Sequence, residues 1–199
     1  MKKSVLVPIA VILAAAVILF ALAAGLAGVG GANARANHLE MMRTLLPGSE
    51  NFTLETYDGD DANIRSVHKA ENGFVIETCT YGYAGDITVF VAVNNEGKVM
   101  GLVVQDMEET PGLGGKALTD YKFLCQFLNN DGEFAVSTTG ADAFSGATGE
   151  TAAPAGETVD VDAITGATVT SKAIVRCVNS AVGYVTGADI SSGATSWGG

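Results

Sequence analysis

The chain has few of the residues that build metal, disulfide or hydrolytic sites. Its 199 residues include three cysteines, Cys79, Cys125 and Cys177, and two histidines. No Cys-x-x-Cys spacing occurs, so the sequence predicts neither a metal site nor a redox dithiol. We expect the cysteines to be buried free thiols. Because no Ser/His/Asp arrangement or pair of catalytic carboxylates is recognisable, we assign no catalytic residue and no metal ligand.

Basic residues are also in a minority, which excludes a further class of partner. The chain has 11 Lys and Arg against 22 Asp and Glu, for a formal net charge of -11 at pH 7. All the acidic residues follow position 39. A surface of this sign repels the phosphates of nucleic acids and anionic lipids. We therefore expect no nucleic-acid partner.

Charge is missing altogether from residues 4–33, which are mostly Val, Ile, Leu, Ala and Gly. A bilayer-spanning helix needs about 20 apolar residues, and the preceding Lys2 and Lys3 favour a cytoplasmic N-terminus. We predict a single N-terminal transmembrane helix within an anchor at residues 1–35, with the following domain on the extracytoplasmic face of the cell membrane. A cleaved signal peptide is the alternative, since Ala32-Asn33-Ala34 resembles a cleavage site.

The remainder predicts one α+β domain at residues 51–188, after a juxtamembrane helix or spacer at 36–50. Within that spacer, a short helix at His38–Leu46 should stop at Pro47-Gly48. Alternating apolar residues predict strands at Phe52–Tyr57, Phe74–Thr80, Ile87–Val93 and Val99–Gln105. The turn signal Asn94-Asn95-Glu96-Gly97 joins the last two strands as a hairpin. Together these strands predict a small antiparallel sheet with packed helices.

Helices are predicted at Ala62–Lys69 and Lys116–Leu128. Residues 129–157 are rich in Gly, Ala, Thr, Ser and Pro, so we expect an exposed, mobile excursion there. A strand at Thr158–Val161 should follow, and residues 189–199 should form a flexible tail.

The most informative stretch runs from Asp162 to Ser171 and leads into an amphipathic helix that ends near Val185. Gly166 permits a tight turn, and the small Ala167 leaves the hydroxyl of Thr168 reachable. Thr170 or Ser171 can cap the helix, whose apolar stripe consists of Ile174, Val175, Val178, Ala181, Val182 and Val185. Because a helix N-terminus favours anions, a phosphate would be stabilised at Thr168.

The short pattern Ser/Thr-Gly-Ala-Thr occurs three times, ending at Thr148, Thr168 and Thr195. Only Thr168 is followed by Val169-Thr170-Ser171 and a predicted helix. We therefore favour Thr168 as the modified residue. The alternative is that all three are loops in a chain rich in Gly, Ala and Thr.

A second glycine-rich stretch, Glu109 to Lys116, lies between the hairpin and the next predicted helix. Its glycines let the backbone approach a flat ligand closely, and Leu113 offers an apolar surface to a ring. The stretch lacks the spacing of a phosphate-binding Walker motif. Taken alone, the stretch is interpreted by default as a structural turn.

These two motifs, together with a third at Gly82 to Ile87, resemble a known family. The Asp162–Ser171 pattern resembles the flavinylation motif of the FMN-binding domains in the G subunit of the Rnf electron-transport complex and the C subunit of the sodium-translocating NADH:quinone reductase. Glu-Thr-Pro-Gly-Leu-Gly at 109–114 is similar to the family segment beside the flavin ring, and Gly82 to Ile87 is similar to Gly-Tyr-x-Gly-x-Ile.

The resemblance implies FMN joined covalently, through its phosphate, to Thr168. It also implies that the remaining cofactor-binding residues come from the two motifs, namely Asp162, Thr165, Gly166, Ala167, Thr170, Ser171, Glu109, Thr110, Gly112, Leu113 and Gly114.

By the same resemblance, the chain would be an electron-carrier subunit, not catalytic alone, in a membrane complex. That complex transfers electrons between ferredoxin and NAD, coupled to sodium or proton translocation. Its partners would be the other Rnf subunits and, during maturation, a flavin transferase. Three alternatives stay open: the C subunit of the quinone reductase, a standalone flavinylated domain serving another extracytoplasmic reductase, and a membrane-anchored binding module without flavin.

Overall fold

The computed structural model describes residues 34–110, 114–115, 120–137 and 158–187. Backbone contacts divide the chain into two units, Met1–Met41 and Met42–Gly199. No helix among the described residues is both long and apolar enough to cross a membrane. The predicted span at residues 4–33 and the predicted tail at 189–199 lie outside the described residues.

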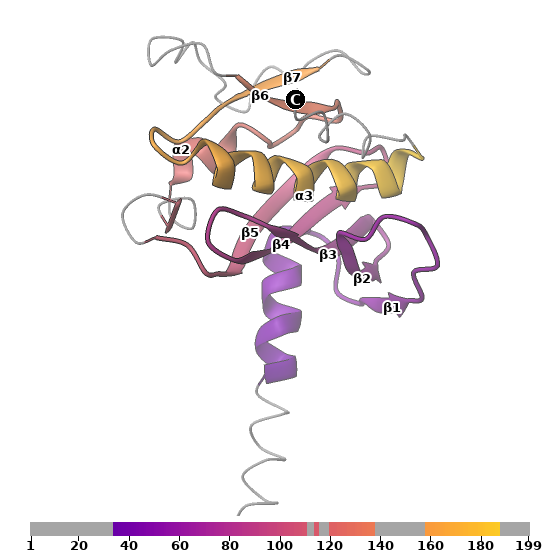
Figure 1. Ribbon diagram of the computed structural model, residues 1–199. Helices are drawn as coiled ribbons and strands as arrows, with labels where there is room; N and C mark the ends of the chain where they lie inside the picture. Colours follow the sequence, from indigo (N-terminus) through magenta and orange to yellow (C-terminus); the bar gives the residue numbers. More distant parts are fainter. Residues whose placement is uncertain (1–33, 111–113, 116–119, 138–157, 188–199) are drawn as a thin grey trace, which may run out of the picture. The chain divides into compact units, whose positions relative to one another are not determined.

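A five-stranded antiparallel sheet forms the centre of the second unit (Figure 1). Its strands follow one another in sequence order: β1 (Thr53–Glu55), β2 (Ile64–Lys69), β3 (Gly73–Tyr81), β4 (Asp86–Asn94) and β5 (Val99–Met107). Such a meander needs only local connections. The predicted α+β class with an antiparallel sheet is confirmed.

The β4–β5 hairpin forms where the turn signal predicts it. Gly97 adopts a φ of 91°, a conformation that side-chain-bearing residues rarely take. The side chain of Asn94 accepts hydrogen bonds from the Glu96 and Lys98 amides at 3.1 and 2.8 Å. These bonds close the turn from within, as is typical of Asn at this position.

The prediction of a helix at Ala62–Lys69 is wrong, because residues 64–69 form strand β2. Ile64 and Val67 are both buried and lie three residues apart, a spacing that suggests a helix. In the sheet, a bulge between Ile64 and Ser66 shifts the register against β3. The extra residue brings Ile64 and Val67 into one buried cluster despite their odd spacing.

Helix α3 (Thr168–Thr186) packs across β3 and β4 (Figure 1). Its predicted stripe is buried from Ile174 to Val182, whereas Val185 is half-buried. The stripe joins alternate residues of β4 in one apolar cluster, Ile87, Val89, Val91 and Val93. Gly187 ends the helix at φ 69°, and its amide bonds the carbonyl of Gly183. The packing of this face fixes the direction in which the start of α3 points.

Residues 129–157 are less exposed than predicted in the part that the structure describes. β6 (Phe134–Ser137) pairs in parallel with β7 (Val159–Asp162), which occupies the predicted strand at Thr158–Val161. Phe134 is only 2% exposed, and Asn179 of α3 bonds both its amide and its carbonyl at 2.9 Å. Phe134 is buried and the other residues of β6 are half-buried, and the polar, glycine-rich sequence around them does not indicate a strand.

Two predicted helices have different bounds. The helix predicted at Lys116–Leu128 is described only as α2 (Tyr121–Cys125), and Asp120 caps it by accepting the amide of Phe123 at 3.2 Å. The helix before Pro47 comprises residues 34–45. Met42 and Leu46, near its end, are 2% and 1% exposed and belong to the core of the second unit.

Replacing Asn179 by alanine should destabilise the protein. The change leaves a buried amide and a buried carbonyl of Phe134 without partners, at a cost of about 2 to 4 kcal/mol. Asn95→Ala removes an exposed bond to the Glu71 carbonyl and should cost no more than about 0.5 kcal/mol. Equilibrium unfolding in urea measures both, and equal losses would contradict the role given to Asn179.

Burial raises the pKa of the Cys177 thiol to about 12 from its ordinary value of 9.0. At pH 8 the thiol is almost entirely neutral in both states. As the pH rises through 9, the unfolded chain ionises first, so folding stability falls until the pH reaches about 12. In Cys177→Ala, the fall in unfolding free energy between pH 8 and 10 should be smaller than in wild type by about 1.4 kcal/mol. Identical slopes in the two proteins would show that Cys177 is not buried as described.

Candidate functional site

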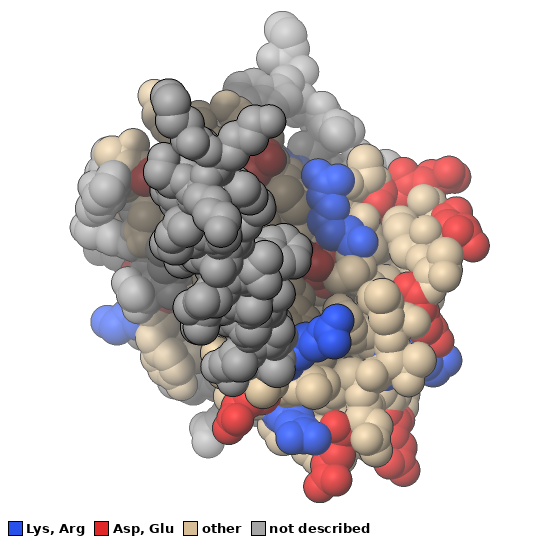
Figure 2. Space-filling model, turned by 90° about the horizontal axis from the view of Figure 1, so that it is seen from below, with Lys and Arg blue, Asp and Glu red and all other residues tan. Residues whose placement is uncertain are grey.

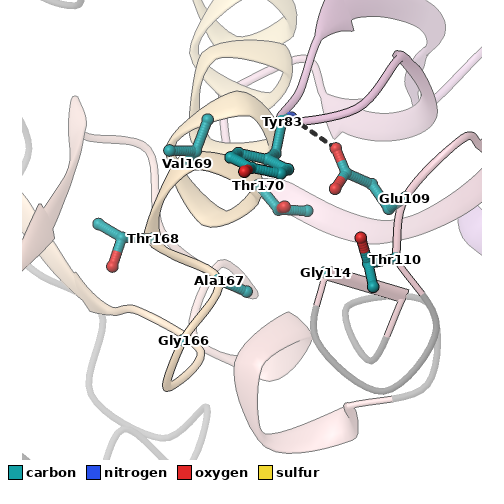
Figure 3. Close-up of a pocket in the computed structure, with 9 residues that line it drawn as sticks. All are labelled: Tyr83, Glu109, Thr110, Gly114, Gly166, Ala167, Thr168, Val169 and Thr170. Atoms are coloured by element: carbon teal, nitrogen blue, oxygen red, sulfur yellow. Dashed lines mark hydrogen bonds between the residues drawn. The ribbon is translucent and has the colours of Figure 1, made fainter.

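A pocket of about 420 Å³ lies at the N-terminal end of α3 (Figure 3). Three segments far apart in the sequence line it: the turn before β4, the segment after β5, and the entry to α3. Its lining residues are Tyr83, Glu109, Thr110, Gly114, Gly166, Ala167, Thr168, Val169 and Thr170. The volume falls within the roughly 300 to 1,000 Å³ typical of small-molecule sites.

The entry to α3 is a tight turn held by Ser171. Gly166 takes a φ of 79° within it. The fully buried hydroxyl of Ser171 accepts the Ile164 amide and donates to the Ala167 carbonyl, both at 3.0 Å. Ser171 therefore holds the turn by bonding its backbone, and it is not among the residues that line the pocket.

The prediction that Thr170 or Ser171 caps α3 is wrong. The helix begins at Thr168, and its N-cap residue is Ala167, which has no side chain able to bond the helix amides. The first amides of a helix lack intrahelical partners and carry a partial positive charge. Because no side-chain cap takes these amides, they are available to an anionic ligand.

Thr168 and Thr170 differ sharply in exposure although both line the pocket. Thr168 is exposed, whereas Thr170 is 1% exposed. Residues two apart on a helix do not share a face, and Figure 3 shows the two side chains on opposite sides of the first turn, with Thr170 toward Glu109. The hydroxyl of Thr168 is thus open to a reacting partner, and that of Thr170 forms part of the pocket wall.

Glu109 ties the segment after β5 to the turn between β3 and β4. Its Oε1 accepts the amide of Tyr83 at 2.6 Å (Figure 3). The same oxygen accepts the amide of Ala84 at 3.3 Å. A Cβ added to Gly82 would collide with that same oxygen. The glycine of the Gly-Tyr motif therefore makes room for the carboxylate that holds Tyr83 at the pocket.

Gly114 allows a similarly close approach. A Cβ at this position would lie 2.6 Å from Oγ1 of Thr170 and 2.7 Å from Oε2 of Glu109. The neighbouring Gly115 is less crowded, since a Cβ there would lie 3.3 Å from the carbonyl of Thr110. The backbone at Gly114 thus brings the segment after β5 against the first turn of α3.

Arg176 links α3 to the end of β3, next to the turn that carries Tyr83. Its Nη2 donates to the Tyr81 carbonyl at 2.9 Å, and its Nε donates to Oγ1 of Thr80 at 3.4 Å. Its partners come from a strand almost a hundred residues earlier, so helical periodicity could not reveal them.

Figure 2 shows basic and acidic side chains interspersed over the coloured part of the face that it presents.

The structure brings together seven of the predicted site residues at the pocket, which are Glu109, Thr110, Gly114, Gly166, Ala167, Thr168 and Thr170. Asp162 does not line it, and its backbone instead bonds the side chain of Gln126 at 2.8 and 3.3 Å. Thr165 lies exposed in the turn without lining the pocket. Gly112, Leu113, Thr148 and Thr195 lie outside the described residues.

Sequence reasoning left Tyr83 and Val169 out of the site residues. Tyr83 is 70% exposed and Val169 is 38% exposed, and both line the pocket. The Gly-Tyr pattern at 82–87 carried the signal for Tyr83, and Val169 is the neighbour of Thr168 within the motif. In the described ranges, no cluster of three His, Cys, Asp or Glu side chains could hold a metal ion.

Several known proteins similar to this chain are named as subunits of ion-translocating oxidoreductase complexes. Over 113 residues the chain is 35% identical to the G subunit of a proton-translocating ferredoxin:NAD(+) oxidoreductase complex from Clostridium ljungdahlii, covering 57% of this chain and 53% of the relative. It is 30% identical to the G subunit of an ion-translocating oxidoreductase complex from Methanosarcina acetivorans, covering 73% of each. The chain thus spans about half to three quarters of the length of these relatives.

Among solved structures, the C subunit of a Na(+)-translocating NADH-quinone reductase from Parabacteroides distasonis is 23% identical, with a TM-score of 0.42. The match covers 60% of this chain and 59% of that one.

The sequence profile of FMN-binding domains matches residues 82–183. This range begins at Gly82, which packs against the Glu109 carboxylate, and it extends through most of α3. It therefore includes every segment that lines the pocket. The chain belongs to the FMN-binding domain family.

Proposed function

We propose that this chain is a flavoprotein electron carrier whose FMN is joined, through its phosphate, to the hydroxyl of Thr168. The observation that carries the proposal is the pocket at the start of α3, where the exposed Thr168 hydroxyl, uncapped helix amides and a glycine-lined wall meet. A family match over these same segments supports FMN as the ligand.

The described residues fit the two chemically different ends of FMN. The amides at the start of α3 suit the phosphate, because they supply donors and a partial positive charge. At the other end of the pocket, the backbone of Gly114 packs closely against Thr170 and Glu109, where a Cβ would collide with both, and Tyr83 lines the pocket as an aromatic side chain suited to a flat ring. A flavin held there supplies one- and two-electron chemistry, while the protein binds it and orients it.

Covalent attachment at the phosphate acts as a tether. The link would lie away from the ring, so Tyr83, Glu109, Thr110 and Gly114 would set the surroundings of the ring by contacts that are not covalent. A tether prevents loss of FMN by dilution outside the cytoplasm. We propose that a separate flavin transferase forms the bond during maturation.

The names of the relatives support a place in a larger assembly. They are G subunits of complexes described as translocating ions or protons, and the Clostridium protein belongs to a ferredoxin:NAD(+) oxidoreductase. We therefore assign this chain to the same position in an Rnf-type complex, anchored in the cell membrane by the apolar residues 4–33. Its partners would be the other members of that complex, and those partners would carry the substrate sites.

The attachment site is tested by in-gel flavin fluorescence of the denatured protein, made together with a flavin transferase. Wild type, Thr148→Ala and Thr195→Ala should fluoresce, and Thr168→Ala should not. Thr168 is exposed and begins the helix, so its loss should leave the fold intact, which circular dichroism can verify.

Thr168→Ser is the matched control because it keeps a hydroxyl at the same position, and it should retain covalent flavin. Fluorescence that persists in Thr168→Ala would move the attachment to another residue. Wild-type protein without flavin would reject the electron-carrier function.

Gly114→Ala tests the wall of the pocket. Its new methyl group meets Thr170 and Glu109 at less than 3 Å, so the segment after β5 must move away from α3. The flavin should stay attached at Thr168 but become more accessible, seen as stronger quenching of its fluorescence by iodide. Gly115→Ala, whose methyl group has more room, should be quenched like wild type. Equal quenching of all three proteins would show that the segment at Gly114 does not shield the flavin.

A further inference from the structure

The two carboxylate oxygens of Glu109 face different surroundings. Oε1 accepts the amides of Tyr83 and Ala84 and so holds the turn before β4 in place. Oε2 lies 2.7 Å from the position of a Cβ on Gly114, a point that is also 2.6 Å from Oγ1 of the buried Thr170. The carboxylate is therefore fixed at the wall of the pocket.

This carboxylate gives the pocket an uneven charge. Among the described residues that line it, Glu109 is the only acidic or basic side chain. The nearby guanidinium of Arg176 is directed to the carbonyl of Tyr81 and the hydroxyl of Thr80. The positive end of the helix dipole lies at Thr168, so one part of the pocket favours an anion and the wall at Glu109 disfavours added negative charge.

We propose that the charge of Glu109 lowers the reduction potential of the flavin bound in this pocket, an inference that rests on the proposed function. Oxidised FMN takes up two electrons from a reductant together with one or two protons from water. With one proton, the reduced ring gains a negative charge. A fixed carboxylate beside the ring opposes that gain, so it stabilises the oxidised form relative to the reduced form.

The test is an equilibrium redox titration of the flavinylated full chain with dithionite and a reference dye, comparing wild type with Glu109→Gln. Glutamine keeps an oxygen that can accept the Tyr83 and Ala84 amides, so it removes the charge while preserving the turn. The ratio of reduced to oxidised flavin at a fixed potential should rise at least tenfold. For a two-electron couple, that is a shift of about +30 mV.

Glu108→Gln is the matched control. Glu108 is the exposed neighbour of Glu109 and does not line the pocket, so removing the same charge there should change the ratio by less than about threefold. Equal shifts in the two variants would overturn the proposal, because they would indicate a general effect of net charge. An unchanged potential in Glu109→Gln would overturn it as well.

A second pair of variants tests the same idea in the opposite direction and does not depend on Glu109→Gln folding. Thr110 is exposed and lines the pocket, and its carbonyl, not its side chain, accepts the Gly115 amide at 3.1 Å. Thr110→Glu should lower the potential relative to Thr110→Gln, which has nearly the same shape without the charge. Equal potentials in this pair would contradict control by charge at the pocket.

In-gel fluorescence separates failure of this inference from failure of the proposed function. Wild-type protein that carries no flavin rejects the proposed function, and this inference is rejected with it. Flavin that is present in all variants with one common potential rejects only the role of Glu109.

Discussion

The packing of α3 across β3 and β4 is the constraint on which the site depends. Residues from Ala173 to Val182 include a buried apolar face, and each large side chain there contributes roughly 1.5 to 3 kcal/mol by leaving water. That face leaves the helix little freedom to rotate or slide. The free amides of its first turn are therefore held at one place, beside the turn that carries Tyr83.

Hydrogen bonds then hold the neighbouring segments in place around the packed helix. Ser171 folds the chain sharply into the helix, Arg176 joins the helix to the end of β3, and Glu109 joins the segment after β5 to the turn before β4. Gly82 and Gly114 matter because side chains there would occupy the space used by the Glu109 carboxylate. Rigid positioning of this kind lets loops serve as the walls of a binding site.

Periodicity and turn chemistry predicted the elements whose causes are local. The β4–β5 hairpin follows from Asn94 and Gly97, and the buried stripe of α3 follows from its regular spacing. β2 was mistaken for a helix because a bulge alters the spacing of Ile64 and Val67, and only its pairing with β3 reveals this. β6 was missed because its partners, β7 and Asn179, are distant in sequence.

The site shows the same division between local and distant causes. The motifs singled out residues of the first turn of α3 and of the segment after β5, but they do not indicate how these two segments meet. Glu109 reaches an amide 26 residues earlier in the chain, a contact that no local pattern encodes. The cap of α3 was assigned wrongly because Ser171 bonds backward to Ile164 and shapes the turn, leaving the helix amides uncapped.

We propose that the first turn of α3 carries a covalent flavin at one threonine. Tandem mass spectrometry of proteolytic peptides, from protein purified out of membranes without recombinant transferase, would locate the flavin. We expect one FMN, bonded with loss of one water, on the peptide that contains Thr168. Flavin found only in the released, noncovalent fraction, or on a peptide containing Thr148 or Thr195, would contradict it.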